Sequence, residues 1–560
     1  TITISLRTDP LYQYQWHLNN TGQTNFATDA GTSGVDLNLD TLISSGIDGS
    51  GITVAVVDSE LEIAHEDLSA NMVANKSYDY ANSDNDPTSS DSSKSHGTAV
   101  AGIIGADAWN NLGGRGVAPD ASLVGYNYIS NQGVSNFVDA LGGVSAGGAD
   151  TSDVDIFNMS FGTSLNASFP GIFSLTKEAA LVNGITNLRS GKGAIYVNAA
   201  GNDWNQSISG TTYWCGPNYG TSNAVRDEQF PCWDANLDSN FATPVIIGVA
   251  SLSAADVRAH YSTPGSSVWV SGFGGQTGGN TDHIGGVYVG GNKPAIMTTD
   301  VSSCSKGAIQ AGISAGSGKN GNAFNNGDHS ENSSCNYNSG FNGTSAAAPT
   351  VSGVIALVLE ANPNLTWRDV KHILASTSTQ VDASKSKSYL GVKQYDWITN
   401  TAGYKHHNWY GFGKINAAAA VSAAESYTAG SLGSFVSASS TSGTINSTFS
   451  SYGRTSYNLS ISAPAGSAGK GEVARVLISM SHIVPNNVGL ELKSPDGTTV
   501  PILQSFTRVT NNPNGTVFAI GVAALYGENM AGTWTLYVTD YTNDSVNGTL
   551  WDWGIIVYGH

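Results

Sequence analysis

Apolar and polar positions in the first three quarters of the chain follow two alternating patterns. Short apolar runs rich in β-branched residues alternate with stretches of small residues, such as the one that begins at His96. We expect buried strands at residues 52–57, 123–128, 155–159 and 194–198. Apolar strands that alternate with helices are typical of a parallel α/β sheet covered on both faces. The active sites of such folds lie at the carboxyl ends of the strands.

After about residue 471 the pattern changes to period two. Alternating residues form one face of each predicted strand, as in the sets Ala474, Val476, Ile478, Met480 and Trp551, Trp553, Ile555, Val557. Several strands of this kind, separated by turn signals, predict an antiparallel β-sandwich.

The chain has 560 residues, too many for one compact core. We expect an α/β domain over residues 1–428 and a β-sandwich domain, with its linker, over residues 429–560. Residues 276–340 are rich in Gly, Ser and Asn and predict a long surface insertion, which could cover a cleft or bind a partner. Residues 429–471 have the composition of a linker that merges into the first strands.

The formal net charge is −19 and charged residues are only 12% of the chain. A surface this acidic repels nucleic acid and anionic membranes, so neither is an expected partner. No apolar run is seen to approach the ~18 residues that cross a bilayer, so no membrane insertion is expected. Because the first ten residues lack the features of a signal peptide, we expect a processed form whose leader has been removed. A secreted monomer is expected.

Four cysteines are present, and their spacings form no zinc pattern. A small, even number fits disulfides in an exported protein, most simply Cys215–Cys232 and Cys304–Cys335. Three pairings are possible, and reduced, buried thiols are the alternative.

Ser345 is the candidate nucleophile. It lies in the small-residue segment Asn342-Gly-Thr-Ser-Ala-Ala-Ala-Pro349, ahead of a buried helical run. Pro349 is tolerated only near the first turn of a helix, which places Ser345 at the helix N-terminus. There the free N–H groups favour a developing anion. A serine that merely caps the helix is the alternative.

His96 and Asp58 complete a candidate triad. His96 opens the segment His-Gly-Thr-Ala-Val-Ala-Gly, and Asp58 ends a β-branched strand. Serine hydrolysis needs a base for the hydroxyl proton and an acid that orients the base. The chain order Asp, His, Ser is that of subtilisin. Asn202, in Asn-Ala-Ala-Gly-Asn-Asp after a predicted strand, could donate to the oxyanion, although Ala-Gly-Asn alone is a common turn.

These four motifs together resemble the subtilase family. The kexin branch is resembled by Gln15-Trp-His-Leu18 near the start, by Leu359-Glu-Ala-Asn-Pro-Asn-Leu-Thr-Trp-Arg-Asp-Val370, and by Tyr410-Gly-Phe-Gly-Lys-Ile415. Gly532-Thr-Trp-Thr-Leu536 and Trp553 resemble the P domain of that branch. The resemblance implies a serine endopeptidase that works through an acyl-enzyme. Its partners would be protein or peptide substrates, with a propeptide or a separate chaperone for folding.

The resemblance also implies bound Ca²⁺. Asp9, Asp67 and Asn111 fall where kexins hold one stabilising ion, and hard oxygen ligands suit calcium. A second acidic loop matches more loosely and could equally be a plain acidic turn; it contains Asp79, Asp84 and Asp86.

The specificity residues of kexins are matched only in part. Ser160, Phe161 and Gly162 would pair with an extended substrate. Asp238 matches one acid of the subsite for the residue before the cleaved bond, which implies a preference for Arg or Lys there. The companion acid is replaced by a segment that leads to Leu165, and the second-subsite acids appear as Ser59 and Ser93.

Two other functions are considered at this stage. A broad degradative protease fits the missing acids. A catalytically silent binding protein fits the sandwich, but it has no need of four intact motifs.

Overall fold

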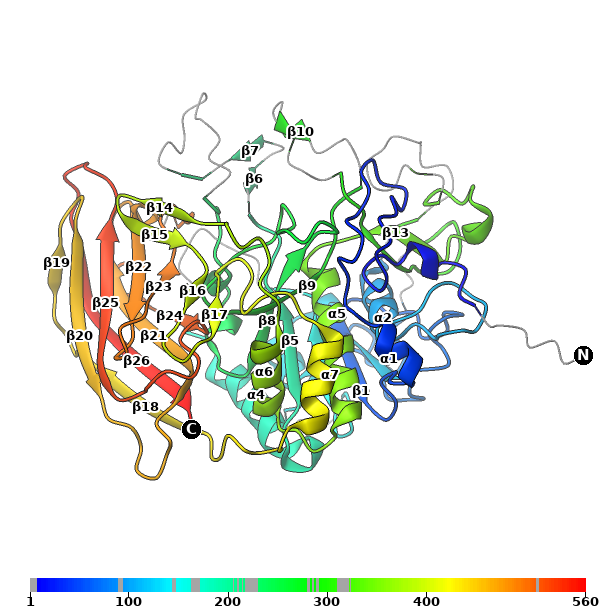
Figure 1. Cartoon of the computed structure of the whole chain (residues 1–560), viewed down its shortest axis with the longest axis horizontal. Coiled ribbons are helices and arrows are strands. Elements are labelled where there is room, and N and C mark those ends of the chain that lie inside the picture. The colour runs from blue at the N-terminus through cyan, green and yellow to red at the C-terminus, as the bar shows by residue number, and fades with distance from the viewer. Residues whose placement is uncertain are drawn as a thin grey trace, which may run out of the picture.

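The chain folds into an α/β domain with a β-sandwich packed beside it (Figure 1). The structure, a computed structural model, describes residues 8–88, 94–143, 148–162, 172–204, 206–208, 211–213, 215–216, 230–278, 283–284, 287–288, 292–309, 322, 324–509 and 513–560.

The α/β domain is built on a seven-stranded sheet in which every neighbouring pair is parallel. In spatial order its strands are β2 (Tyr78–Asp79), β3 (Ser122–Asn127), β1 (Thr53–Asp58), β4 (Ile156–Met159), β5 (Ile195–Ala199), β8 (Ile246–Leu252) and β9 (Val268–Phe273). The four strands expected from the apolar runs are therefore confirmed, and their side chains are almost all buried.

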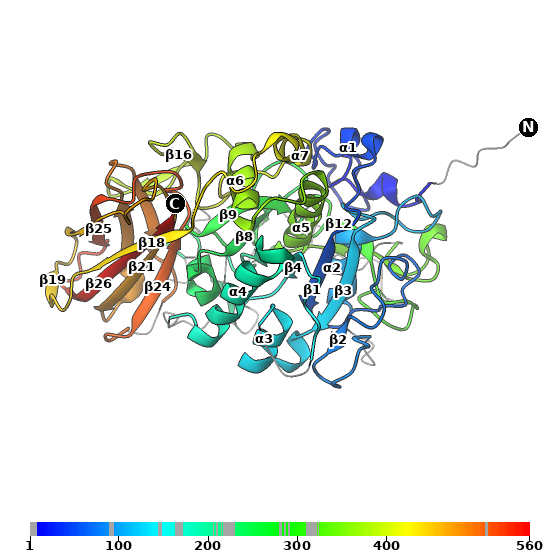
Figure 2. The same cartoon turned by 90° about the horizontal axis from the view of Figure 1, so that it is seen from below.

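Helices cover both faces of this sheet, as expected for continuous apolar strands. They are α1 (Asp40–Ser45), α2 (His96–Gly105), α3 (Val134–Ala140), α4 (Leu175–Asn187), α5 (Thr344–Ala361), α6 (Trp367–Thr377) and α7 (Ala417–Ser426). Figure 2 shows α3 and α4 on one side of the sheet and α5, α6 and α7 on the other. The Thr366 side chain caps α6 in a reciprocal pair with Asp369.

Helix α5 has 18 residues, whereas the sequence analysis expected no apolar run of about that length. By length and composition it could cross a membrane, with a mean hydropathy of 1.4, but 83% of it is buried inside the protein. It packs against α2, α7 and the central strands. Among the described residues it is the one helix of this kind, and it is the core helix of the domain.

The predicted insertion braces helix α2. Its strands β12 (Ile296–Thr299) and β13 (Tyr337–Phe341) pair antiparallel. The Thr298 and Thr299 hydroxyls donate to the carbonyls of Ala99 and Thr98 in the first turn of α2, each at 2.7 Å. The Cys304–Cys335 disulfide closes the loop between the two strands. Cys215–Cys232 is the second disulfide, so the simplest of the three pairings is confirmed.

Short antiparallel pairs decorate the α/β domain. They are β6 (Gln206–Ile208) with β7 (Thr211–Tyr213), β10 (His283–Ile284) with β11 (Val287–Tyr288), β14 (Lys387–Tyr389) with β15 (Val392–Tyr395), and β16 (Ile398–Thr399) with β17 (Lys405–His406).

The C-terminal domain is the predicted antiparallel sandwich. One sheet contains β18 (Val436–Thr441), β19 (Ser447–Phe449), β21 (Gly471–Ser481), β24 (Val517–Val522) and β26 (Gly548–Gly559). The other contains β20 (Arg454–Ile461), β22 (Val488–Lys493), β23 (Thr499–Leu503) and β25 (Gly532–Asp540). The apolar faces of the two sheets form one core.

One detail of the sandwich agrees with the sequence analysis, and another differs from it. The expected linker already contains three strands, β18 to β20, whose many exposed Ser and Thr side chains give the segment its linker-like composition. Trp551, expected on the buried face of its strand, is half-buried. It has no partner in the register because a bulge on β26 shifts the pairing with β21 at Ser479 and Met480.

Buried ionic contacts join the two domains. Arg368 of α6 donates from Nε to both carboxylate oxygens of Glu472 on β21, at 3.1 and 3.0 Å. The Nδ1 atom of His560 lies 2.8 Å from the same carboxylate. Arg475 pairs with Glu178 of α4 and donates to the Ala242 carbonyl. The sandwich is therefore joined to the α/β domain by two ion pairs, Arg368 with Glu472 and Arg475 with Glu178.

Candidate active site

Asp58 and His96 are in hydrogen-bond contact at the carboxyl edge of the sheet. Asp58 is the last residue of β1 and is fully buried, while His96 opens α2. The His96 Nδ1 atom lies 2.6 Å from Asp58 Oδ1, and the Ser59 N–H donates to the same oxygen at 2.7 Å. Since the carboxylate accepts, Nδ1 carries the hydrogen and Nε2 is the atom that can act as base.

Gly97 lets this contact form. A Cβ atom at Gly97 would lie 2.6 Å from the Glu60 carbonyl oxygen and 2.8 Å from that of Ser59. Only glycine allows α2 to begin so close to the loop that follows Asp58, the last residue of β1.

Ser345 is the second residue of α5 and is partly exposed. Gly343 before it has φ 104°, a conformation that favours glycine, and its N–H donates to the Tyr261 hydroxyl at 2.9 Å. The ring of Phe341, at the end of β13, meets the His96 ring edge-on at 5.3 Å. The segment that carries Ser345 therefore runs past the imidazole.

Ser160 locks this helix start to the end of β4. The Ser345 hydroxyl donates to the Ser160 carbonyl at 3.1 Å, and the Ser160 hydroxyl donates to the Ser345 carbonyl at 2.9 Å. Pro349, the sixth residue of α5, has no N–H to reach the carbonyl four residues earlier. The Ser160 hydroxyl takes the place of that missing donor, which explains why the proline is tolerated beyond the first turn.

Asn202 is held through its amide oxygen. Its Oδ1 atom accepts from the Thr344 N–H at 2.8 Å and from the Thr344 hydroxyl at 3.0 Å. Because a backbone N–H can only donate, this oxygen is assigned without ambiguity and Nδ2 is left as the donor. Asn202 therefore contacts the residue before the candidate nucleophile and keeps its Nδ2 hydrogens for donation, as an oxyanion donor must.

Replacing Asn202 by alanine is expected to lower kcat about 10²–10³-fold with KM almost unchanged, because the donor acts mainly on the transition state. Steady-state kinetics on a peptide substrate measures this effect. Asn136→Ala, which removes an exposed amide from α3, is the control and should leave kcat unchanged. A tenfold rise in KM with constant kcat would contradict the assignment.

A cavity of about 230 Å³ opens beside Asn202. It is lined by Gly162, Ala199, Ala200, Gly201, Asn202, Asp203, Ala235, Asp238 and Phe241. Asp238 is buried and caps a short 3-10 helix (Ser239–Ala242), with its Oδ1 accepting from the Asn240 N–H at 3.0 Å. A Cβ at Gly162 would lie 3.2 Å from Asp238 Oδ2, so the glycine keeps the cavity open in front of that oxygen.

The segment Ser160 to Gly162, whose last residue lines this cavity, is held by neighbouring side chains. Asn198 of β5 donates to the Phe161 carbonyl at 2.7 Å, and the Phe161 ring packs on Tyr128. Sequence reasoning missed Asp203, which also lines the cavity. Its signal was an acid that follows directly after the candidate oxyanion residue.

Asp9 and Asp67 approach the same loop, as expected for one calcium site. Asp9 accepts from the N–H groups of Trp109 and Asn110, at 2.9 and 3.2 Å. The amide on Asp67 Oδ1 is that of Asn110, at 2.8 Å, whereas the Asn111 side chain accepts from the Thr8 N–H instead. The Asn110 amide thus meets Asp67 as an N–H donor, and its own oxygen accepts from the Leu112 N–H, so Asn111 stays the predicted ligand.

The residues of the second acidic loop are not brought together in this way. Asp79 is buried and accepts from Ala81, Asn82 and Asn127, so its oxygens are already used. Asp84 and Asp86 each accept from a backbone N–H two residues later, as in ordinary turns. Within the described residues, no group of three or more His, Cys, Asp and Glu side chains could hold a metal ion.

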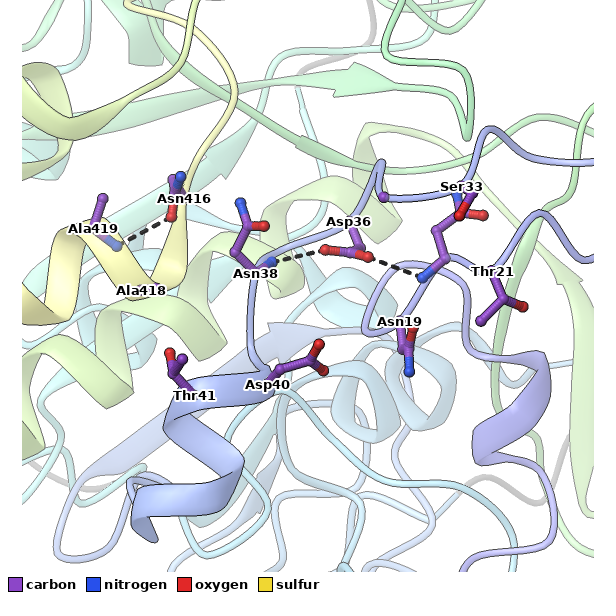
Figure 3. A pocket seen from close by; sticks show the side chains of 12 residues that line it. Asn19, Thr21, Ser33, Asp36, Asn38, Asp40, Thr41, Asn416, Ala418 and Ala419 are labelled. Atoms are coloured by element: carbon purple, nitrogen blue, oxygen red, sulfur yellow. Dashed lines mark hydrogen bonds between the residues drawn. The ribbon is translucent and has the colours of Figure 1, made fainter.

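A second cavity, of about 760 Å³, lies between the N-terminal segment and α7 (Figure 3). The Asp36 carboxylate crosses its floor and accepts from the N–H groups of Asn20 and Asn38. Asn416 at its rim caps α7. None of the candidate catalytic residues lines this cavity.

The fold and site define a class of protein. A buried acid on an imidazole, a serine at a helix N-terminus and a neighbouring amide with a donor nitrogen, at the carboxyl edge of a parallel sheet, form the arrangement of a triad serine hydrolase. Residues 49–413 match the subtilase family and residues 471–557 match the proprotein convertase P-domain. The chain belongs to the subtilase family of serine proteases and carries a convertase-type P domain.

Relatives share both parts of this architecture. The chain is 31% identical to the Aeromonas extracellular serine protease of Aeromonas sobria, over 96% of this chain and 85% of the relative. It is 26% identical to neuroendocrine convertase 2 of Caenorhabditis elegans, over 98% of this chain and 76% of the relative. The crystal structure of the Aeromonas sobria serine protease superposes with a TM-score of 0.84 at 29% identity, covering 99% of this chain and 96% of that one. A crystal structure of the same protease with the chaperone gives a TM-score of 0.84 as well, at 29% identity, over 99% and 95% of the two chains.

Proposed function

We propose that this subtilase is a secreted, calcium-stabilised endopeptidase that prefers Arg or Lys before the cleaved bond. The Asp58–His96 hydrogen bond beside the Ser345 helix is the observation that carries the proposal. We further propose that residues 1–428 form the catalytic domain and residues 429–560 the P domain with its linker.

Each catalytic residue has a role in this proposal. His96 takes the Ser345 proton while the serine oxygen attacks the peptide carbonyl, and it then gives that proton to the leaving amine. Asp58 holds the imidazole and stabilises its cation. Asn202 and the Ser345 N–H donate to the oxyanion of the tetrahedral intermediate, and water then releases the acyl group. For the first step, the Ser345 hydroxyl has to turn from the Ser160 carbonyl toward His96.

The cavity supports a preference for a basic residue, because the Asp238 carboxylate lines it. Digestion of an unbiased peptide mixture, with the cleaved bonds read by mass spectrometry, should show Arg and Lys enriched before the cut. Asp238→Asn should reduce that enrichment about tenfold or more, since it removes the charge that pairs with the substrate cation. A flat profile in the wild-type enzyme would instead favour the broad degradative protease.

One observation favours loose recognition of the substrate residue in the second subsite. Ser59, at one position where kexins have an acid, accepts from the Gly97 N–H through its hydroxyl and carries no charge. The other two sequence markers of reduced specificity, Ser93 and Leu165, lie outside the described residues. Strict dibasic recognition is therefore not part of the proposal.

Asp9 and Asp67 fit a calcium ion, with the Asn111 side-chain oxygen as the predicted third ligand. Burial raises the pKa of Asp67 to about 7, with the negative charges of Asp9 and Asp107 acting in the same direction, and burial also raises the pKa of Asp9 to about 6. The Asp67 Oδ2 atom is buried and has no hydrogen-bond partner among the described residues. A divalent cation would supply that partner and neutralise the carboxylates, since hard oxygen ligands suit calcium.

Calcium is expected to raise the free energy of unfolding by about 2.7 kcal/mol at a concentration of one hundred times its Kd. Differential scanning calorimetry in EDTA and in CaCl₂ measures this effect as a shift in Tm. Asp67→Asn should abolish the shift, whereas Asp84→Asn, in the exposed turn, should keep it. An equal Tm in both buffers would remove calcium from the proposal.

Secretion and assisted folding are proposed from the relatives and the covalent structure. The Aeromonas sobria relative is described as extracellular, and two disulfides suit an oxidising compartment. Because that protease has been crystallised with the chaperone, we propose that a propeptide or a separate chaperone helps this chain to fold. We propose that the mature enzyme is a monomer.

A further inference from the structure

The cavity beside Asn202 contains a second carboxylate. Asp203 follows Asn202 directly and lines the same cavity as Asp238, from the segment after β5 rather than from the short helix that Asp238 caps. None of the residues that line the described cavity carries a positive charge. The two acids thus stand on different walls of one small space.

The backbone holds Asp203 firmly in this position. Its N–H donates to the Thr263 hydroxyl at 2.9 Å, and the Thr263 N–H donates to the Gly201 carbonyl at 3.0 Å. Gly201 has φ 108°, and a Cβ there would lie 3.5 Å from Asp203 Oδ2. The turn that places Asn202 at the nucleophile therefore also places the next side chain in the cavity.

The electrostatic setting of the two acids differs. Burial raises the pKa of Asp203, and only the backbone N–H of Asn202 acts in the other direction. Asp238 already interacts with the charge of Lys177 on α4, whose ammonium group lies 4.5 Å from the Phe137 ring centre. A substrate cation would therefore offset the cost of burying the Asp203 charge.

We propose that Asp203 is a specificity-determining residue, which together with Asp238 forms a two-carboxylate pocket for the basic side chain before the cleaved bond. This inference rests on the proposed function and adds a residue to it. The acid expected after Gly162 is absent from the sequence, and Asp203 supplies a second charge from a different element. A guanidinium or ammonium group has enough N–H donors to meet oxygens on both walls.

The test uses the full-length enzyme and two peptides that differ only in Arg or norleucine before the cleaved bond. The measured quantity is the ratio of kcat/KM for these two peptides. Asp203→Asn keeps the size of the side chain and removes the charge, so the ratio should fall about 10- to 100-fold, as when a hydrogen bond to a charged group is lost. Asp396→Asn, which breaks an exposed pair with Lys393, is the matched control and should leave the ratio unchanged.

The outcomes separate this inference from the proposed function. A ratio that falls in Asp238→Asn but not in Asp203→Asn leaves the proposed preference standing and overturns the role of Asp203. A wild-type enzyme with equal rates on both peptides overturns both. If Asp203→Asn does not fold, Asp203→Ser is measured in the same way and an unchanged ratio has the same meaning.

Discussion

Replacing Ser345 by alanine is expected to lower kcat roughly 10⁶-fold, the loss that subtilisin itself suffers when its nucleophile is removed. In the proposed mechanism the Ser345 side-chain oxygen forms the acyl-enzyme, so neither His96 nor Asn202 can compensate. Hydrolysis of casein and of a chromogenic peptide measures the loss. Phenylmethylsulfonyl fluoride should label the wild-type protein on the tryptic peptide that contains Ser345.

Ser422→Ala is the matched control for this prediction. It removes an exposed hydroxyl from α7 and should leave kcat unchanged. Full activity in the Ser345 variant, or a sulfonyl label on another serine, would show that the nucleophile lies elsewhere. A purified wild-type protein that is inert toward every polypeptide would instead favour a silent binding protein.

Replacing Glu472 by alanine is expected to destabilise the protein by about 3–5 kcal/mol, because it leaves the Arg368 guanidinium buried without its carboxylate. Burial alone would raise the pKa of Glu472. Hydrogen bonds from His560 and Arg368, together with the charge of Arg368, outweigh burial and hold the pKa below the ordinary value of 4.5. The ionised carboxylate thus stabilises the fold above that pH, and this contribution is lost as the pH falls through the folded pKa. The difference between variant and wild type should shrink in acid.

Urea unfolding followed at pH 7 and at pH 4 or lower measures both effects. Asp396→Ala breaks the exposed pair with Lys393 and should cost less than about 1 kcal/mol at either pH. An equal, small loss in the two variants would mean that the sandwich is held by its apolar contacts alone. A loss in Glu472→Ala that grows in acid would contradict the assigned direction of the pKa shift.

The sequence predicted those parts of the molecule that depend on local patterns. Buried strands are short apolar runs, so the sheet was recognised from residues 52–57 and their counterparts. The candidate catalytic side chains each follow a strand or open a helix within a distinctive motif. The two faces of the sandwich followed from period two, except at Trp551, where the bulge depends on pairing with β21 that no local pattern encodes.

The parts that escaped prediction depend on contacts between distant segments. Whether Asn110 or Asn111 faces Asp67 is decided by the backbone turn, since neighbouring residues point in different directions. In the sequence Asp203 belongs to a common turn, and only the structure shows that it lines the same cavity as Asp238. The pair of Arg368 and Glu472 joins residues 104 positions apart, which composition and periodicity cannot connect.

The Ser160 hydroxyl replaces the hydrogen-bond donor that Pro349 lacks, and this couples two positions that are far apart in the chain. Helix α5 can carry a proline at position 349 because the hydroxyl of Ser160, directly after β4, donates to the Ser345 carbonyl. The N–H of residue 349 would otherwise donate to that carbonyl. A variant with alanine at position 349 would regain a backbone N–H that donates to the Ser345 carbonyl, so the Ser160 hydroxyl would no longer be needed there. Changes at the two sites should therefore be tolerated jointly far better than the loss of the alcohol alone.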